Sequence, residues 1–185
     1  WQEAGYFGYY GPGWNDNQQP FENGDVAMWI GSSGSFGGLQ QSMKHPFAST
    51  YLPYWGSVEG AGGSTFIGGA ALFALAGHDA EENKATAAFF EFLTSPEVQY
   101  MWHRETGYVP ITTAAYEMAK AEGYYDEAPS AETGILQLLL PAGEWTKGYR
   151  LGFYPQVRDV INRETGKIFS GETSVEDALK TIDQE

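Results

Sequence analysis

The clearest apolar pattern in the chain consists of two short runs, VAMWI at 26–30 and FIGGAALFALAG at 66–77. Apolar runs of this length, bounded by glycine and polar residues, are typical of buried strands. The first run ends in the turn GSSGSFGG at 31–38, after which helical spacing begins. The second contains the pair Gly68 and Gly69, and a glycine pair inside a strand indicates a bulge or the close approach of a ligand or of other backbone. We therefore predict two strands, with both explanations of the glycine pair left open.

Helical spacing dominates from Asp79 onward. Apolar positions recur along one predicted helical face at Ala85, Ala88, Phe89, Phe92 and Leu93. Serine followed by proline at 95–96 predicts a new helix with a serine N-cap, and Gly107 predicts its end. Thr112 or Thr113 is predicted to cap the helix after that.

The last third of the chain predicts three more helices. The residues at 130–140 form one apolar segment, and Pro155 lies near the first position of a second helix, whose apolar face also carries Glu164. Capping-box spacing from Thr173 to Glu176 begins the final helix. Two strands beside about six helices favour an α/β fold, with a small sheet covered by many helices.

Composition and charge exclude several classes of partner and chemistry. The 185 residues carry a formal net charge of −14, which disfavours nucleic acid and anionic lipid as partners. The chain has no cysteine, so disulfides, thiol catalysis and cysteine metal sites are excluded. Aromatic residues make up 16% of the chain, a surplus that indicates either ring faces for a ligand such as a sugar or a partner interface.

The beginning of the chain does not have the pattern of a secretory signal. Its first residues lack a basic segment followed by an apolar one, and no apolar run approaches the roughly 20 residues that cross a bilayer. Because the sequence starts at Trp1 without an initiator methionine, we expect a mature or truncated piece of a longer protein.

Catalytic and metal-binding patterns are sparse. The three histidines, at 45, 78 and 103, have no zinc-motif spacing, and His103 is most simply explained as a cation at a helix C-terminus. Ser33 lies in GSSGS rather than in the GxSxG of a nucleophile elbow. We therefore expect no metal, no cofactor and no enzymatic activity.

The serine-rich turn is the first candidate binding element. Ser32, Ser33 and Ser35 follow an apolar run and precede a helix, where hydroxyls and free N–H groups can bind an anion or a polyol. The alternative is a strand followed by a capped helix that binds no ligand.

Arg158 is the second candidate. We place it in the first turn of its predicted helix, where a cation opposes the helix dipole and calls for a compensating carboxylate, such as Asp159, or a bound anion. A guanidinium is well shaped to bind phosphate.

Five segments of the chain together resemble a known family. VAMWIGSSGSFGG, FIGGAALFAL, WHRETGYVPITTAAY, EGYYDEAP and KGYRLGFYPQVRDVI occur in this order. Together they resemble the family 1 extracellular solute-binding proteins of bacterial ABC importers, in the branch that binds sn-glycerol 3-phosphate. The resemblance implies a fold like that of type II periplasmic binding proteins, with residues 1–185 forming the C-terminal part of a two-lobe protein whose N-terminal lobe is absent from this chain.

The resemblance also implies binding residues. It assigns a hydroxyl contact to Ser33, with Ser32 and Ser35 as neighbours, and a backbone N–H contact to Gly69, with Gly68 beside it. It assigns the phenol of Tyr108 and the guanidinium of Arg158 to the ligand, with Arg150 as an alternative cation.

The implied role is binding without chemistry. The ligand would be a phosphate ester or polyol, glycerol 3-phosphate or a glycerophosphodiester, and the protein partner a membrane-embedded ABC permease. We expect a monomer in the periplasm, or outside the cell and anchored to the membrane. Two alternatives stay open: a sugar-binding receptor of the same fold, and a glycosidase-type enzyme.

Overall fold

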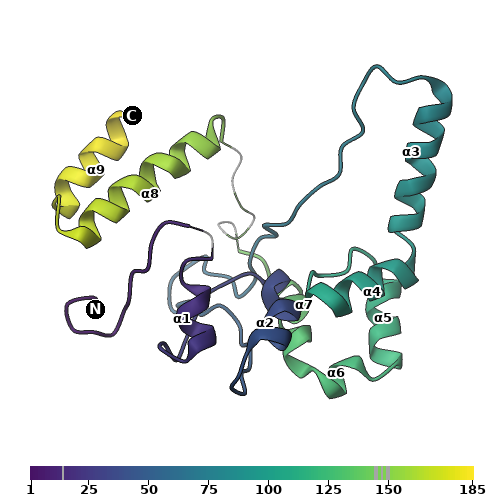
Figure 1. The fold of residues 1–185 in the computed structure, drawn as a ribbon, viewed down its shortest axis with the longest axis horizontal. Coiled ribbons are helices and arrows are strands. Elements are labelled where there is room, and N and C mark those ends of the chain that lie inside the picture. Colours follow the sequence, from purple (N-terminus) through teal and green to yellow (C-terminus); the bar gives the residue numbers. More distant parts are fainter. Residues whose placement is uncertain (14, 144–145, 147, 149–150) are drawn as a thin grey trace. The chain divides into compact units, whose positions relative to one another are not determined.

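A computed structural model describes residues 1–185 except 14, 144–145, 147 and 149–150. The chain divides into two compact units (Figure 1). Unit 1 contains Trp1–Trp29 and Tyr149–Glu185, and unit 2 contains Ile30–Gly148.

Unit 2 is helical and carries most of the candidate residues. Its elements are η1 (Ser33–Ser35), α2 (Phe36–Ser42), α3 (Ala80–Leu93), α4 (Pro96–Thr106), α5 (Thr113–Ala121), α6 (Tyr124–Glu127), η2 (Pro129–Glu132) and α7 (Thr133–Leu138). Helices α4 and α5 pack against each other, and α2 packs on α4. Ala115 and Ala119 of α5 are fully buried, and their small side chains allow α5 to pack closely against its neighbours.

A cluster of aromatic rings completes the core of unit 2. Phe36, Tyr100, Tyr124 and Tyr125 are all buried there, together with the alanines of α5 and Ile135 of α7. The Tyr124 and Tyr125 rings lie 5.4 Å apart between centroids, and Tyr100 meets Tyr124 edge-on at 6.3 Å. This aromatic core therefore ties α2, α4, α5 and α6 together.

The predicted helix boundaries around α4 and α5 are confirmed. Ser95 is the N-cap of α4 with proline directly after it, and Gly107 ends the helix in the left-handed conformation at φ 86°. Thr112 caps α5, since its side chain accepts a hydrogen bond from the Ala115 N–H.

The predicted small sheet is not found among the described residues. The runs at 26–30 and 66–77 are extended or irregular chain, with Met28, Ile30 and Phe73 at least 73% exposed. A strand is stabilised by hydrogen bonds to a neighbouring strand, and the described part of the chain offers neither run such a neighbour. The two strand predictions are therefore wrong for this chain, although both runs lack helix as predicted.

The helix predicted from Asp79 onward forms as α3, but its apolar face stays uncovered by the described residues. Helix α3 begins with a complete capping box between Asp79 and Glu82. Phe89 and Phe92 are 54% and 60% exposed. The capping box and the helical spacing are enough to form α3, whereas burial of its apolar face needs a partner surface that the described residues do not provide.

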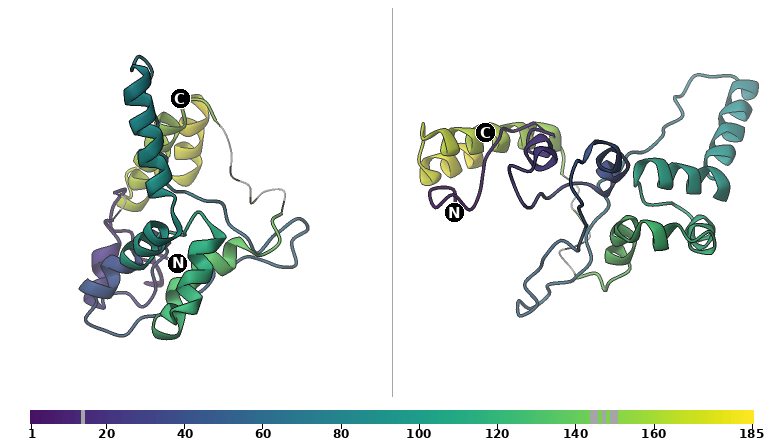
Figure 2. Two further views of the ribbon diagram at one scale, coloured as in Figure 1. Left: turned by 90° about the vertical axis from the view of Figure 1, so that its right-hand side faces the viewer. Right: turned by 60° about the horizontal axis from the view of Figure 1, so that its bottom comes forward.

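Unit 1 combines an N-terminal segment with the last two long helices. Its helices are α1 (Gln18–Asn23), α8 (Tyr154–Ser170) and α9 (Val175–Gln184). Helices α8 and α9 pack side by side, as two views show (Figures 1 and 2). Tyr9 stacks on Phe169 of α8 at 4.7 Å between ring centroids, so the N-terminal segment packs on α8. Pro155 lies in the first turn of α8 as predicted, whereas the N-cap of α9 is Ser174, one residue after the predicted Thr173.

Candidate ligand-contact residues

The serine-rich turn of unit 2 folds into η1 and the start of α2. Ser32 caps η1, because its Oγ accepts a hydrogen bond of 3.2 Å from the Gly34 N–H. Its hydroxyl is therefore engaged in holding the turn. Ser33 is exposed, and within the part of the chain that the structure describes its Oγ has no hydrogen-bond partner. Ser35 is half-buried and is the N-cap residue of α2, without a side-chain capping bond.

Ser33 and Tyr108 are brought together by close contacts at glycines. A Cβ on Gly34 would lie 2.8 Å from a ring carbon of Tyr108, so the ring packs directly on the turn. A Cβ on Gly107 would collide with the carbonyl oxygen of Ser33. A Cβ on Gly134 would lie 3.4 Å from the Ser33 Oγ, so α7 borders the same hydroxyl. The structure thus places two predicted contact residues, 75 positions apart in sequence, side by side.

Tyr108 presents its ring at the surface of this turn. Tyr108 is 42% exposed, and no described residue forms a hydrogen bond with its phenol. Its backbone is fully engaged: the N–H donates to the Thr106 Oγ1 at 3.1 Å, and the carbonyl lies 2.7 Å from the His103 Nδ1. The arrangement offers two hydroxyls, from Ser33 and Tyr108, to a polar ligand.

His103 lies in the last turn of α4 as predicted, but it is not the charged partner of the helix dipole that the sequence suggested. It is 1% exposed, and its Nε2 lies 2.9 Å from the Tyr125 hydroxyl. Burial lowers the pKa of His103, and the hydrogen bond with the Tyr108 carbonyl opposes that shift in part. The ring is therefore neutral near pH 7 and acts through hydrogen bonds rather than through charge. Sequence reasoning missed this role, although the segment HRETGY contained a signal: a glycine at the helix end turns the chain back toward its last turn.

The glycine pair at 68–69 lies in an open segment of chain. A Cβ on Gly68 would have no described neighbour within 4 Å, and one on Gly69 would meet only the side chain of Ile67. The structure does not bring this pair beside Ser33 or Tyr108. Its predicted role as an N–H donor to a ligand stays a prediction.

Arg158 belongs to unit 1. Helix α8 begins at Tyr154, which makes Arg158 its fifth residue, one turn in rather than within the first turn. Its guanidinium carbon lies 5.8 Å from the centroid of the Tyr154 ring. Among the described residues no carboxylate forms an ion pair with it, and Asp159 does not provide the compensation considered above. Arg150, the alternative cation, lies outside the described residues.

Other features of the described chain are less informative. Two hollows of unit 2, about 270 and 220 Å³ in volume, are lined by residues other than the predicted ones. No group of three or more metal-ligating side chains is found in the described ranges. Within those ranges no helix has both the length and the apolar character needed to cross a membrane.

Comparison with known proteins finds a clear match. The family described as bacterial extracellular solute-binding protein matches residues 1–133. The chain is 39% identical over 180 residues, 97% of its length, to the sn-glycerol-3-phosphate-binding periplasmic protein UgpB of Salmonella typhimurium, and shows the same identity to UgpB of Yersinia enterocolitica. It spans about two-fifths of the length of these relatives (41%).

The fold comparison agrees with the sequence comparison. UgpB from Mycobacterium tuberculosis, solved in complex with glycerophosphocholine, matches with a TM-score of 0.75 and 24% sequence identity, over 90% of this chain and 40% of that one. This likeness supports the predicted fold class, one like that of periplasmic binding proteins, without the small sheet.

Proposed function

Because this chain belongs to the family of bacterial extracellular solute-binding proteins, we propose that it binds glycerol 3-phosphate or a glycerophosphodiester, as part of the substrate-binding component of an ABC importer. The observation that carries the proposal is the 39% identity over 97% of the chain to a protein named for binding sn-glycerol 3-phosphate. The role is binding and delivery in the periplasm, without turnover of the ligand. The residues described here supply part of a binding shell, and the other lobe of a two-lobe protein supplies the rest.

Each candidate residue has an assigned contact in this proposal. Ser33 and Tyr108 donate hydroxyl hydrogen bonds to the glycerol or phosphate oxygens, and their uncommitted hydroxyls support this assignment. Ser32 caps the turn around Ser33, and both Ser32 and Ser35 are assigned to the surroundings of the same ligand. Gly69, with Gly68 beside it, offers a backbone N–H group.

Arg158 is assigned to the phosphate. A net charge of −14 gives the chain no diffuse attraction for an anion, so phosphate binding needs a local cation. Arg158 meets that need because no described carboxylate neutralises it. Its planar fork can donate two parallel hydrogen bonds to phosphate oxygens, and Arg150 is the alternative donor.

Calorimetric titration of the full-length protein tests the proposal. We expect binding of sn-glycerol 3-phosphate and glycerophosphocholine, and little binding of maltose. The Arg158→Ala variant is expected to lose phosphate-ligand affinity by about tenfold or more, because a charge-assisted hydrogen bond contributes about 1.5–3 kcal/mol.

Three results would contradict the proposal or part of it. Tight binding of maltose with none of the phosphate esters would favour a sugar receptor. Release of a product from a glycerophosphodiester or a glycoside would show an enzyme. An Arg158→Ala variant with unchanged affinity for both phosphate esters would remove Arg158 from the site, and Arg163→Ala, which alters an arginine of the same helix already paired with carboxylates, is the matched control.

A further inference from the structure

We propose that His103 is a positioning residue for Tyr108, and that its neutral ring holds the Tyr108 backbone so that the phenol stays beside Ser33. The inference rests on the function proposed above, in which Tyr108 contacts the ligand. His103 itself does not reach the ligand, because it is 1% exposed.

The hydrogen bonds of the ring determine its tautomer. The Nδ1 lies 2.7 Å from the Tyr108 carbonyl oxygen, which can only accept, so Nδ1 carries the proton. The Nε2 of a neutral ring then accepts, and the Tyr125 hydroxyl donates to it across 2.9 Å. Burial raises the pKa of Tyr125, so its hydroxyl keeps the proton that it donates. Both ring nitrogens therefore form hydrogen bonds, Nδ1 as the donor and Nε2 as the acceptor.

The position of the ring matters because of the turn that follows α4. Gly107 reverses the chain at φ 86°, and Tyr108 comes directly after it. Two side chains of α4 then bond the Tyr108 backbone: the Thr106 Oγ1 accepts from its N–H, and the His103 Nδ1–H donates to its carbonyl. With both polar groups tied to one helix, the peptide planes on either side of Tyr108 are fixed.

Fixing the backbone also fixes the ring. The Tyr108 ring lies so close to Gly34 that a Cβ on this glycine would be 2.8 Å from a ring carbon. Small rotations of the Tyr108 backbone would therefore move the ring into the serine turn or away from it. A loss of the His103 donor leaves the Tyr108 carbonyl without its partner and releases one of the two restraints. The phenol then loses its fixed position relative to Ser33, and the ligand has to restore that order when it binds.

Two conservative substitutions distinguish the hydrogen bond at Nδ1 from the hydrogen bond at Nε2. The amide N–H of asparagine can replace the donor at Nδ1, whereas glutamine reaches the position of Nε2 and leaves the Tyr108 carbonyl without a donor. We expect His103→Gln to weaken binding of sn-glycerol 3-phosphate and glycerophosphocholine by roughly five- to tenfold, about the value of one hydrogen bond. We expect His103→Asn to retain most of the affinity.

A double-mutant cycle with Tyr108→Phe tests whether the effect passes through the phenol. If it does, His103→Gln costs little further affinity once the Tyr108 hydroxyl is absent, so the two losses are not additive. Tyr116→Phe is the matched control, because it removes a hydrogen bond of 2.6 Å to Glu132 in the same core and leaves both partners of the Tyr108 backbone in place. It is expected to lower the unfolding midpoint and leave the dissociation constants unchanged.

The possible outcomes are distinct. If the full-length wild type binds neither ester, the proposed function fails and this inference with it. If the wild type binds and Tyr108→Phe weakens binding, but His103→Gln has no effect or adds fully to Tyr108→Phe, only the inference fails. If His103→Gln does not fold, the nitrogen-15 spectrum of wild-type histidine decides: a proton on Nδ1 supports the inference, and a proton on Nε2 overturns it.

Discussion

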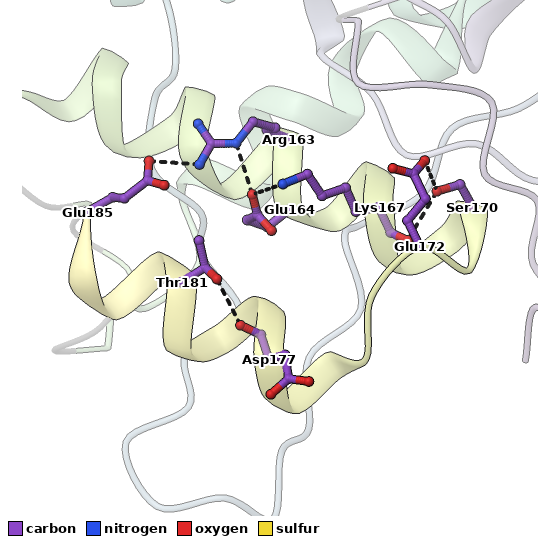
Figure 3. A network of polar contacts seen from close by, with 8 residues as sticks. All are labelled: Arg163, Glu164, Lys167, Ser170, Glu172, Asp177, Thr181 and Glu185. Carbon is purple, nitrogen blue, oxygen red and sulfur yellow. Dashed lines mark hydrogen bonds and ion pairs between the residues drawn. The ribbon is translucent and has the colours of Figure 1, made fainter.

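Among the described residues, unit 2 buries a histidine and unit 1 buries a glutamate, and the surroundings of the two side chains differ in kind. In unit 2, His103 is held neutral by burial and bonded to uncharged groups. In unit 1, Glu164 is 2% exposed and stays charged between Arg163 and Lys167 (Figure 3). The neutral group fixes a turn that carries a candidate contact residue, whereas the charged group lies in a network along two helices.

The network in unit 1 extends beyond the buried carboxylate. The Glu164 Oε1 lies 2.8 Å from the Lys167 Nζ and 2.9 Å from the Arg163 Nε, and a second nitrogen of Arg163 lies 2.7 Å from a carboxylate oxygen of Glu185 (Figure 3). Lys167 and then Arg163 lower the pKa of Glu164 by donating to its charged form. Since Glu185 follows α9, the network ties the end of the chain to α8 and complements the packing of the two helices.

The two units are therefore sensitive to different kinds of substitution. A neutral buried group has few partners and depends on hydrogen-bond directions, so its loss is felt locally and strongly. A charged network spreads its interactions over half-exposed cations that water can solvate, so a single loss costs less.

The largest effect is expected from His103→Leu. Leucine leaves the buried Tyr125 hydroxyl and the part-buried Tyr108 carbonyl without their partner, and an unsatisfied buried group costs about 1–3 kcal/mol. We therefore expect a loss of about 2–4 kcal/mol in the free energy of unfolding, measured by urea denaturation of the full-length protein. Hydrogen exchange should show the loss in the amides of α5 and not in those of α9, and a uniform loss in both would contradict the local role of His103.

The next effect is a difference in pH dependence between the units. The pKa of folded His103 lies below its ordinary value of 6.5, so below pH 6.5 the unfolded chain takes up a proton that the folded chain excludes. The stability of unit 2 therefore falls as pH drops from 6.5, by at most about 1.4 kcal/mol per pH unit. The facing titratable groups, Tyr124 and Tyr125 of α6, both have raised pKa values and stay neutral in this range.

For unit 1 the corresponding range is more acidic. The folded pKa of Glu164 lies below its ordinary value of 4.5, so the stability that its charge contributes is present above pH 4.5 and is lost as the pH falls further. Hydrogen exchange of α5 and α9 amides between pH 7 and pH 4 measures both. We expect α5 to lose protection first, and His103→Leu to abolish that early loss; simultaneous loss in the two helices would argue against the assignment.

The smallest effect is expected from Glu164→Gln. Glutamine keeps the shape and can still accept a hydrogen bond, but it removes the charge that Arg163 and Lys167 share. We expect faster amide exchange in α9 and a lower unfolding midpoint, by less than for His103→Leu. Lys180→Gln is the control, since its pair with Asp177 lies at the surface with both side chains more than 60% exposed. An equal effect of the two variants would show that the burial of Glu164 adds nothing.

Local features of the fold were predictable from sequence, and features that depend on partners were not. Ser95, Gly107 and Thr112 bound their helices as predicted, because a cap acts through the nearest few residues. The predictions of strands at 26–30 and 66–77 were wrong, because a strand needs a neighbouring strand, which can be distant in sequence, and the described residues provide none.

The residues of the candidate site show the same contrast between local features and features that depend on distant partners. The structure places Ser33 beside Tyr108, while the assignment of both to one ligand stays a prediction that came from resemblance. The role of His103 was missed because it depends on the Gly107 turn and on Tyr125 of a different helix. The position of Arg158 was misjudged by about one residue, because α8 begins at Tyr154.

Gly107 carries a consequence for how this protein can vary. A side chain at position 107 would be strained by the left-handed backbone conformation. Its Cβ would also collide with the Ser33 carbonyl oxygen and with the Cβ of Phe36, which would lie 2.7 Å away. Gly38 in α2, by contrast, has open space where a Cβ would lie. A side chain at position 38 therefore meets no described neighbour, whereas one at position 107 would distort the turn that carries Tyr108, even though the two glycines lie on neighbouring elements.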